Sequence, residues 1–271
     1  MYEKMLERIN NELKLGNEVA FATLMEVKGS SPGKQGATLC YFKNKSTMGT
    51  VGGGILEHEI INKCKECLET KEDSLFEHIL SGNSQDTPMQ CGGSVKGYIK
   101  IFKPRPRFLI VGGGHVGHSL YNVSQSLDFY TIIVDDREEF ANKERFKNAE
   151  EVYSGEIANI LSDMRIDDNT YVVIATRGYE KDLEALRAII NKSASYIGMI
   201  GSRKKWITLK SELIEEGVSE ELLEKVYAPV GLNISSNEVD EIAFGIIAEL
   251  LLVKNKGDLS HRKNKNLRID K

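Results

Sequence analysis

No stretch of about 18 uncharged apolar residues occurs in this chain of 271 residues, so we do not expect a transmembrane helix. Residues 1–19 alternate charged and apolar side chains and lack the apolar core of a signal peptide. Both absences favour a cytoplasmic protein without a membrane partner. Hydrophobic residues make up 41% and charged residues 28% of the chain, which excludes a collagen-like or wholly disordered protein.

An overall excess of positive charge is also absent, because the net charge is −4. Residues 254–271 carry seven Lys or Arg and two Asp, a local charge of +5, which leaves −9 for the rest. An acidic body argues against a protein built to hold nucleic acid. The basic tail is open to contact with RNA or an acidic partner, but a solvated, frayed terminus is the interpretation we favour.

Cysteine is scarce, and the four cysteines of a cytoplasmic chain are expected to be free thiols. Cys64 and Cys67 form a C-x-x-C pair inside a predicted helix, and a zinc site there would also need His58 and Cys91. We therefore favour a buried or idle pair of helix thiols, and a core position for Cys40. Cys91 precedes two glycines in a loop, which favours either an exposed candidate thiol for chemistry or an ordinary free cysteine.

Hydrophobic periodicity predicts a small α+β unit in residues 1–103. Its predicted helices are 3–15 and 55–68, its strands are 19–27, 37–42 and 95–102, and its loops include 29–33 and a glycine-rich turn at 49–54. Two prolines within three residues, at 104–106, cannot lie inside a helix or a central strand. We place the domain boundary there, with a second domain over 104–253 and a basic tail over 254–271.

The second domain alternates strands and helices. The predicted strands are 108–111, 130–134, 151–153, 171–175, 196–200 and 226–227, and the predicted helices are 116–127, 182–190, 204–216 and 238–253. This alternation indicates right-handed βαβ units and a parallel sheet covered on both faces. The fold class is therefore α/β, with a C-terminal Rossmann-like sheet and a smaller α+β N-terminal domain.

A glycine-rich loop of the dinucleotide-binding type follows the first strand of that domain. Gly112, Gly114 and Gly117 form G-x-G-x-x-G at the start of a predicted helix, and Asp135-Asp136 ends the next strand about 20 residues on. The helix N-terminus offers N–H groups and a partial positive charge to a phosphate. Asp135 favours NAD over NADP, and the nearby Arg137 would weaken that preference. The alternative is a Rossmann-like domain that has kept the loop and lost the ligand.

Two more segments are predicted at the same edge of the sheet. Gly201, Ser202 and Arg203 join a strand to a helix and form either a second anion-binding corner or an ordinary βα turn with basic residues. Thr176 and Asp182, like Asp136, are placed to bind substrate but also to cap a helix.

A nicotinamide dehydrogenase would need an acid or base beside its substrate carbon. None of the five histidines is predicted at the carboxyl end of a later strand, where such a group belongs. This weakens the dehydrogenase hypothesis without excluding it.

Taken together, the order and spacing of these motifs resemble one family, the xanthine dehydrogenase accessory proteins of the XdhC/CoxI type. The segments that carry the resemblance are Gly29-Ser30-Ser31-Pro32, Gly49–Gly54 with Leu56-Glu57, Cys91-Gly92-Gly93, Gly112–Gly117, Asp135-Asp136-Arg137, Thr176-Arg177-Gly178 with Asp182, Tyr196–Lys205, Ala228–Leu232, Asp240–Ala243 and Ala248-Glu249.

The resemblance implies a maturation factor without turnover of its own. Such a protein binds the molybdenum cofactor (molybdopterin), protects it while a cysteine desulfurase supplies the terminal sulfur, and delivers it to an apo molybdenum hydroxylase such as xanthine dehydrogenase. The pterin phosphate suits the glycine loop. Cys91 is the family-matching thiol that would ligate molybdenum or relay sulfur.

The chain departs from the family pattern at several positions. Gly54 is followed by Ile55 where many members have a cysteine, and Gly33 stands where an arginine is frequent. Asn233 and Ser235 replace an aspartate and a glycine. Any chemistry or turn that depends on those family residues is in doubt here.

We expect the ligand site in a cleft between the two domains, and closed symmetric homodimers are common enough to expect one here. Three hypotheses remain open: a cofactor-binding chaperone, an NAD(P)-dependent oxidoreductase, and a degenerate Rossmann module that only docks onto partners. The predicted cofactor-binding residues are Gly52, Gly53, Gly54, Gly92, Gly93, Gly112, Gly114, His115, Gly117, Asp135, Asp136, Thr176, Gly201, Ser202 and Arg203.

Overall fold

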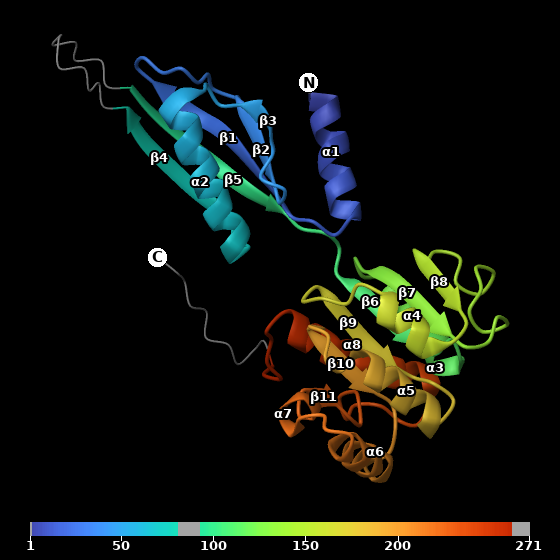
Figure 1. Cartoon of the computed structure of the whole chain (residues 1–271). Helices are drawn as coiled ribbons and strands as arrows, with labels where there is room; N and C mark the ends of the chain where they lie inside the picture. Colours follow the sequence, from blue (N-terminus) through green and yellow to red (C-terminus); the bar gives the residue numbers. More distant parts are fainter. Residues whose placement is uncertain (1, 81–92, 262–271) are drawn as a thin grey trace. The chain divides into compact units, whose positions relative to one another are not determined.

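The computed structural model describes residues 2–80 and 93–261 (Figure 1). The chain divides into two compact units, Met1–Arg105 and Pro106–Lys271. Each unit has its own sheet and its own hydrophobic core. Within the described residues, no helix combines the length and the apolar character needed to cross a membrane.

The first unit is built on a five-stranded antiparallel sheet with strand order β3-β2-β1-β5-β4. The strands are β1 Val19–Lys28, β2 Thr38–Phe42, β3 Thr47–Thr50, β4 Ser74–Leu80 and β5 Gly93–Phe102, and the helices are α1 Tyr2–Lys14 and α2 Gly54–Thr70. Side chains alternate between the two faces of the sheet. One face packs against Leu56, Ile60 and Cys64 of α2, and the other packs against Met5 and Ile9 of α1.

Both edge strands of this sheet went unpredicted. β3 lies where the sequence indicated part of a glycine turn, and its residues are exposed or half-buried. β4 carries apolar side chains on its solvent face, with Leu75 70% and Ile79 69% exposed. An edge strand pairs with only one other strand, and its side chains are less covered than those of a central strand. The alternation of apolar and polar residues that marks a half-buried strand is therefore weak in both β3 and β4.

The second unit contains a six-stranded parallel sheet with strand order β11-β10-β9-β6-β7-β8. The strands are β6 Arg107–Val111, β7 Tyr130–Asp135, β8 Glu151–Ser154, β9 Thr170–Ile174, β10 Tyr196–Met199 and β11 Val226–Tyr227. This is the Rossmann order, in which the direction of winding reverses between the first and fourth strands, here β6 and β9. The predicted α/β class with a Rossmann-like parallel sheet is confirmed.

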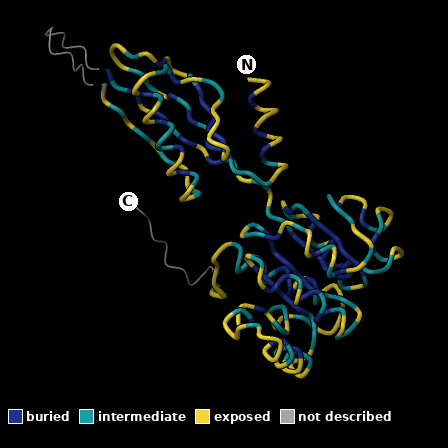
Figure 2. Tube along the Cα trace, viewed as in Figure 1, coloured by how far each residue is buried: buried dark blue, intermediate teal, exposed yellow. Residues whose placement is uncertain are grey.

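Helices cover both faces of the parallel sheet (Figure 1). Their bounds are α3 His115–Ser124, α4 Ile157–Asp163, α5 Tyr179–Ile189, α6 Arg203–Glu215, α7 Glu220–Leu223 and α8 Val239–Lys254. Helices α4, α5 and α6 pack on one face, and α3 with α8 packs on the other. The central strands are buried along most of their length (Figure 2). The sequence did not predict α4 and α7, which are only two turns and one turn long.

Candidate functional site

The carboxyl ends of β10, β9, β6 and β7 lie next to one another at one edge of the parallel sheet. The loops that leave these ends, together with the strand and helix residues that flank them, hold most of the predicted second-domain residues. These are Gly112, Gly114, His115, Asp135, Asp136, Thr176, Gly201, Ser202 and Arg203. Ligands of open α/β sheets bind where the strand order reverses, which is between the loops after β6 and β9. The structure therefore brings the predicted residues of this domain together at the expected position.

The loop after β6 and the first turn of α3 contain glycines in two different environments. A Cβ atom on Gly112 would lie 2.2 Å from the Ala175 carbonyl oxygen, and one on Gly117 would lie 1.8 Å from the Gly112 carbonyl oxygen. A Cβ atom on Gly113 would meet the Phe140 carbonyl oxygen at 2.1 Å. These three glycines are required by packing, and Gly112 also has φ +116°, which favours glycine.

Gly114 differs from its neighbours in the loop. It is the N-cap of α3 with φ −67°, and an added Cβ would have no atom within 4 Å. Neither backbone conformation nor packing therefore requires glycine there. The open space lies at the N-terminus of a helix, where the N–H groups of the first turn have no partner within the helix. Glycine at this position leaves room for an anionic ligand to approach the backbone closely.

Asp135 stabilises the glycine loop from the end of β7. Its Oδ2 accepts a hydrogen bond from the Gly113 N–H at 2.8 Å, and the Arg137 guanidinium donates to both carboxylate oxygens at 2.9 and 3.0 Å. Burial acts to raise the pKa of Asp135, but the Arg137 and Gly113 hydrogen bonds outweigh it and hold the pKa below its usual value. The carboxylate is 2% exposed, so its hydrogen-bonding capacity is used within the protein.

Asp136 is the more accessible acid of the pair. Its side chain is 17% exposed and forms an ion pair with Arg177 at 2.9 Å, from the loop after β9. The pair joins the ends of β7 and β9 across the intervening β6. A ribose hydroxyl at this edge would meet Asp136 together with two arginines, Arg137 and Arg177, rather than an isolated carboxylate.

Arg145 is a residue of this edge that the sequence analysis missed. Its Nη2 donates to the Gly113 carbonyl oxygen at 3.1 Å, and its Nε is buried without a hydrogen-bond partner among the described residues. It belongs to the irregular segment between β7 and β8. No periodicity or motif marks this position, so only the three-dimensional structure shows that a guanidinium contacts the glycine loop.

Thr176 and Asp182 form part of a buried polar network. The Thr176 hydroxyl donates to Asp182 Oδ1 at 2.5 Å, and the Lys205 ammonium contacts Asp182 Oδ2. Asp182 is 1% exposed, and its burial raises the pKa of the carboxyl although Lys205 and Thr176 oppose the shift. Ser202 caps α6 by accepting a hydrogen bond from the Lys205 N–H at 3.2 Å. The network fixes the loops after β9 and β10 relative to each other.

In the first unit, Glu57 holds the glycine-rich turn that begins α2. Its Oε2 accepts hydrogen bonds from the Thr50 hydroxyl at 2.5 Å and from the N–H groups of Val51 and Gly53 at 3.1 and 3.2 Å. The Thr50 hydrogen bond lowers the pKa of Glu57 against the opposing effect of burial. Gly53 and Gly54 have positive φ and no atom within 4 Å of an added Cβ. Their open, left-handed backbone is compatible with a ligand that approaches closely.

Other glycines of this unit are required by packing. A Cβ on Gly52 would lie 2.4 Å from the Gly33 nitrogen, and one on Gly33 would lie 2.2 Å from the Val51 carbonyl oxygen. This contact excludes a side chain at position 33 of this chain. Gly93, at the start of β5, similarly packs against the Ser30 carbonyl oxygen. Cys91 and Gly92 lie outside the described residues, and a shared site with the second unit stays a prediction.

Three cysteines are buried, as the sequence analysis expected. Cys64 and Cys67 face the core from α2, and Cys40 lies within β2. Burial raises the pKa of Cys40 and of Cys64 to about 12, and burial also raises the pKa of Cys67. A thiol held protonated is a poor nucleophile and a poor metal ligand. In the described parts of the chain, no group of three or more His, Cys, Asp or Glu could hold a metal ion.

We expect Cys40 and Cys64 to resist alkylation in the folded protein. At pH 8 their raised pKa leaves about a thousandfold less thiolate than an exposed cysteine has, before steric protection is counted. Iodoacetamide labelling followed by peptide mass spectrometry, with a urea-unfolded sample as control, measures this. Rapid labelling of either residue in the folded protein would contradict the burial described here.

Comparisons with known proteins agree with this arrangement. A family model described as the XdhC Rossmann domain matches residues 108–250, and one described as the XdhC and CoxI family matches residues 13–78. The Escherichia coli (strain K12) protein described as uncharacterized protein YqeB is 31% identical, over 87% of this chain and 43% of YqeB. The chain therefore spans less than half the length of that relative.

Two more relatives are matched over nearly their whole length. A Bacillus subtilis (strain 168) protein described as a probable xanthine dehydrogenase subunit is 20% identical over 88% of this chain and 94% of the relative. Among solved structures, a crystal structure of a xanthine dehydrogenase from Bacillus halodurans matches with a TM-score of 0.52. It is 20% identical and covers 93% of this chain and 96% of that chain. At this identity the structural match establishes the fold alone.

Proposed function

Because this chain belongs to the XdhC and CoxI family, we propose that it is a maturation factor for a molybdenum hydroxylase such as xanthine dehydrogenase. In this proposal it binds the molybdenum cofactor, protects it while sulfur is added, and delivers it to the apo-enzyme. The match to a probable xanthine dehydrogenase subunit supports the choice of hydroxylase.

The observation that carries the proposal is the open position at Gly114. The molybdenum cofactor contains a pterin with a phosphate group, and a phosphate fits a helix N-terminus beside a glycine without steric neighbours. Gly114 and the first turn of α3 would hold the phosphate, and Arg145 would add positive charge behind the loop. When bound, the group supplies the metal and the dithiolene sulfurs that the hydroxylase uses in its own reaction.

Addition of sulfur to the cofactor would need an accessible thiol if this chain takes part in it. The three described cysteines are buried and have raised pKa values, so none of them suits exchange of sulfur with a cysteine desulfurase. Cys91 is the remaining candidate for molybdenum ligation or sulfur relay, and it lies outside the described residues.

Delivery is tested by reconstitution of an apo-hydroxylase with cofactor-loaded protein, cysteine desulfurase and cysteine. We expect the wild-type protein to restore hydroxylase activity and the Cys91→Ser variant to restore markedly less. Cys64→Ser is the matched control, because its thiol is buried in the core. Equal delivery by wild-type protein and Cys91→Ser would remove the thiol from the proposal and leave a passive carrier.

An NAD(P)-dependent oxidoreductase is the second candidate, favoured by the Rossmann strand order and the glycine loop. Asp135, however, is occupied by Arg137 and the Gly113 N–H, which leaves Asp136 to contact a ribose. His115, the histidine in the loop, is exposed at the start of α3. Calorimetric titration with NAD and NADP distinguishes the candidates, because tight binding of a nicotinamide nucleotide without cofactor binding would favour the oxidoreductase.

A further inference from the structure

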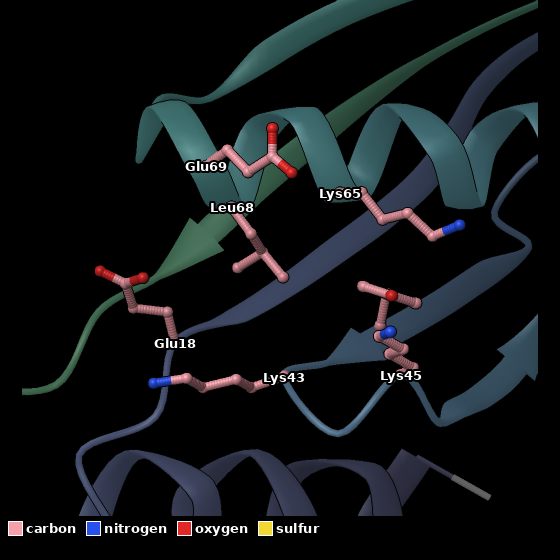
Figure 3. A pocket seen from close by; sticks show the side chains of 7 residues that line it. Glu18, Lys43, Lys45, Lys65, Leu68 and Glu69 are labelled. Carbon is pink, nitrogen blue, oxygen red and sulfur yellow. The ribbon is translucent and has the colours of Figure 1, made fainter.

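The first unit contains a pocket of about 490 Å³ that the proposed function does not use. It lies between the C-terminal half of α2 and the turn that joins β2 to β3 (Figure 3). The lining residues are Glu18, Tyr41, Lys43, Lys45, Lys65, Leu68 and Glu69. The volume is within the range of small-molecule sites, which is about 300–1,000 Å³.

Three lysines from two elements line this pocket. Lys43 and Lys45 come from the turn after β2, and neither forms an ion pair with any residue that the structure describes. Lys65, on α2, donates to the Asn62 side-chain oxygen at 3.0 Å, which is a neutral partner. By contrast, Lys63 on the same helix pairs with Glu66 at 2.9 Å and is not part of the lining. Glu18 and Glu69 also line the pocket, and the Lys43 side chain extends toward Glu18 (Figure 3). Lys45 and Lys65 lie away from Glu18, and neither forms an ion pair with a described residue.

Tyr41 provides a second, independent observation. Its side chain is 5% exposed and packs in the core under α2, yet it also lines the pocket. Its hydroxyl makes no hydrogen bond to the residues that the structure describes. The Tyr41 oxygen is not among the buried, unpaired polar atoms of the described residues, so it reaches the open space of the pocket and is available to a ligand or to water. The ring of Tyr41 and the side chain of Leu68 add an apolar surface beside the ammonium groups.

Lys45 is held in an unfavourable backbone conformation. Its φ is +65°, in the left-handed region where glycine or asparagine is more usual. The Lys45 N–H donates to the Phe42 carbonyl oxygen at 2.8 Å, which fixes the turn. The backbone of this turn therefore favours another residue, and the ammonium group is the feature that lysine adds.

We propose that this pocket binds a small organic phosphate with an aromatic or apolar body. The phosphate contacts Lys45 and Lys65 and accepts a hydrogen bond from the Tyr41 hydroxyl. The body of the ligand lies against the Tyr41 ring and Leu68. Glu18 and Glu69 disfavour ligands that carry a second negative charge at that end. This site belongs to the first unit alone and does not depend on the glycine loop of the second.

Phenyl phosphate is the probe that tests the proposal, titrated calorimetrically into the full chain carrying Gly114→Asp. That background removes the phosphate site of the second unit, so binding there cannot account for the signal. We expect saturable binding that is tighter than that of inorganic phosphate and of phenol. No saturable binding of phenyl phosphate would overturn the proposal and would leave the proposed cofactor function unaffected.

Four variants locate the binding. Lys45→Asn removes the charge and suits the left-handed backbone, and Lys65→Gln removes the second charge from the helix surface. Each is expected to weaken phenyl phosphate binding by about tenfold, and Tyr41→Phe by several-fold. Lys63→Gln is the matched control on α2 and is expected to bind like the parent. Equal binding by Lys45→Asn and Lys65→Gln, or an equal loss in Lys63→Gln, would overturn the assignment.

Discussion

Replacing Gly114 with aspartate is expected to abolish binding of a phosphate-bearing ligand while the second unit stays folded. The added side chain meets no atom of the protein within 4 Å, and Gly114 has φ −67°, so neither packing nor backbone opposes the change. Aspartate is also a favourable N-cap residue. Its carboxylate occupies the position of the phosphate and repels it, because two like charges about 4 Å apart repel by about 4 kcal/mol at an effective dielectric of 20.

This repulsion lowers the affinity by at least about a hundredfold. Calorimetry measures the loss, and thermal unfolding shows whether the midpoint is preserved. Unchanged ligand affinity in Gly114→Asp would mean that the loop does not bind phosphate. A third outcome is that the wild-type protein binds no ligand and that Gly114→Asp still docks onto a partner protein. That outcome would favour the hypothesis of a degenerate Rossmann module.

Gly117→Ala is expected to give the opposite result, a loss of stability rather than a selective loss of binding. A Cβ at this position would lie 1.8 Å from the Gly112 carbonyl oxygen, which is backbone and cannot move aside cheaply. We expect a loss of about 3 kcal/mol in the free energy of unfolding of the second unit. For a unit of this size the unfolding midpoint falls by about 6–12 °C.

Chemical and thermal denaturation of Gly117→Ala and Gly114→Ala, side by side, provide the test. The two variants add the same single methyl group at the N-cap of α3 and at the third residue of that helix. A midpoint for Gly117→Ala within a degree of the wild-type value would contradict the close helix–strand packing in this structure.

The sequence predicted the parallel sheet and the position of the glycine loop because both depend on local patterns. Strand 108–111, the glycines after it and the acidic pair Asp135-Asp136 follow one another within 30 residues. The edge strand β4 was missed because Leu75 and Ile79 point to solvent and give no buried alternation. Short α4 and α7 are stabilised by tertiary packing, which a window of sequence does not contain.

The candidate site was predictable in its position and less so in its contacts. The sequence indicated Asp135 as a ribose ligand, and only the structure shows its carboxylate bonded to Gly113 and Arg137. No sequence motif indicates that Arg145 contacts the Gly113 carbonyl oxygen or that Glu57 accepts a hydrogen bond from the Val51 N–H. The pocket of the first unit could not be predicted from the sequence, because its lining comes from residues 18, 41–45 and 65–69, which are distant in the sequence.

Direct binding of the molybdenum cofactor to the purified protein tests the central claim most directly. Anaerobic calorimetry would compare the wild-type protein with Gly114→Asp, using matched unfolding curves to show that both are folded. The account predicts tight, near-stoichiometric binding by the wild-type protein and a loss of at least about a hundredfold in the variant. Absence of cofactor binding by the folded wild-type protein, or equal binding by both proteins, would contradict it.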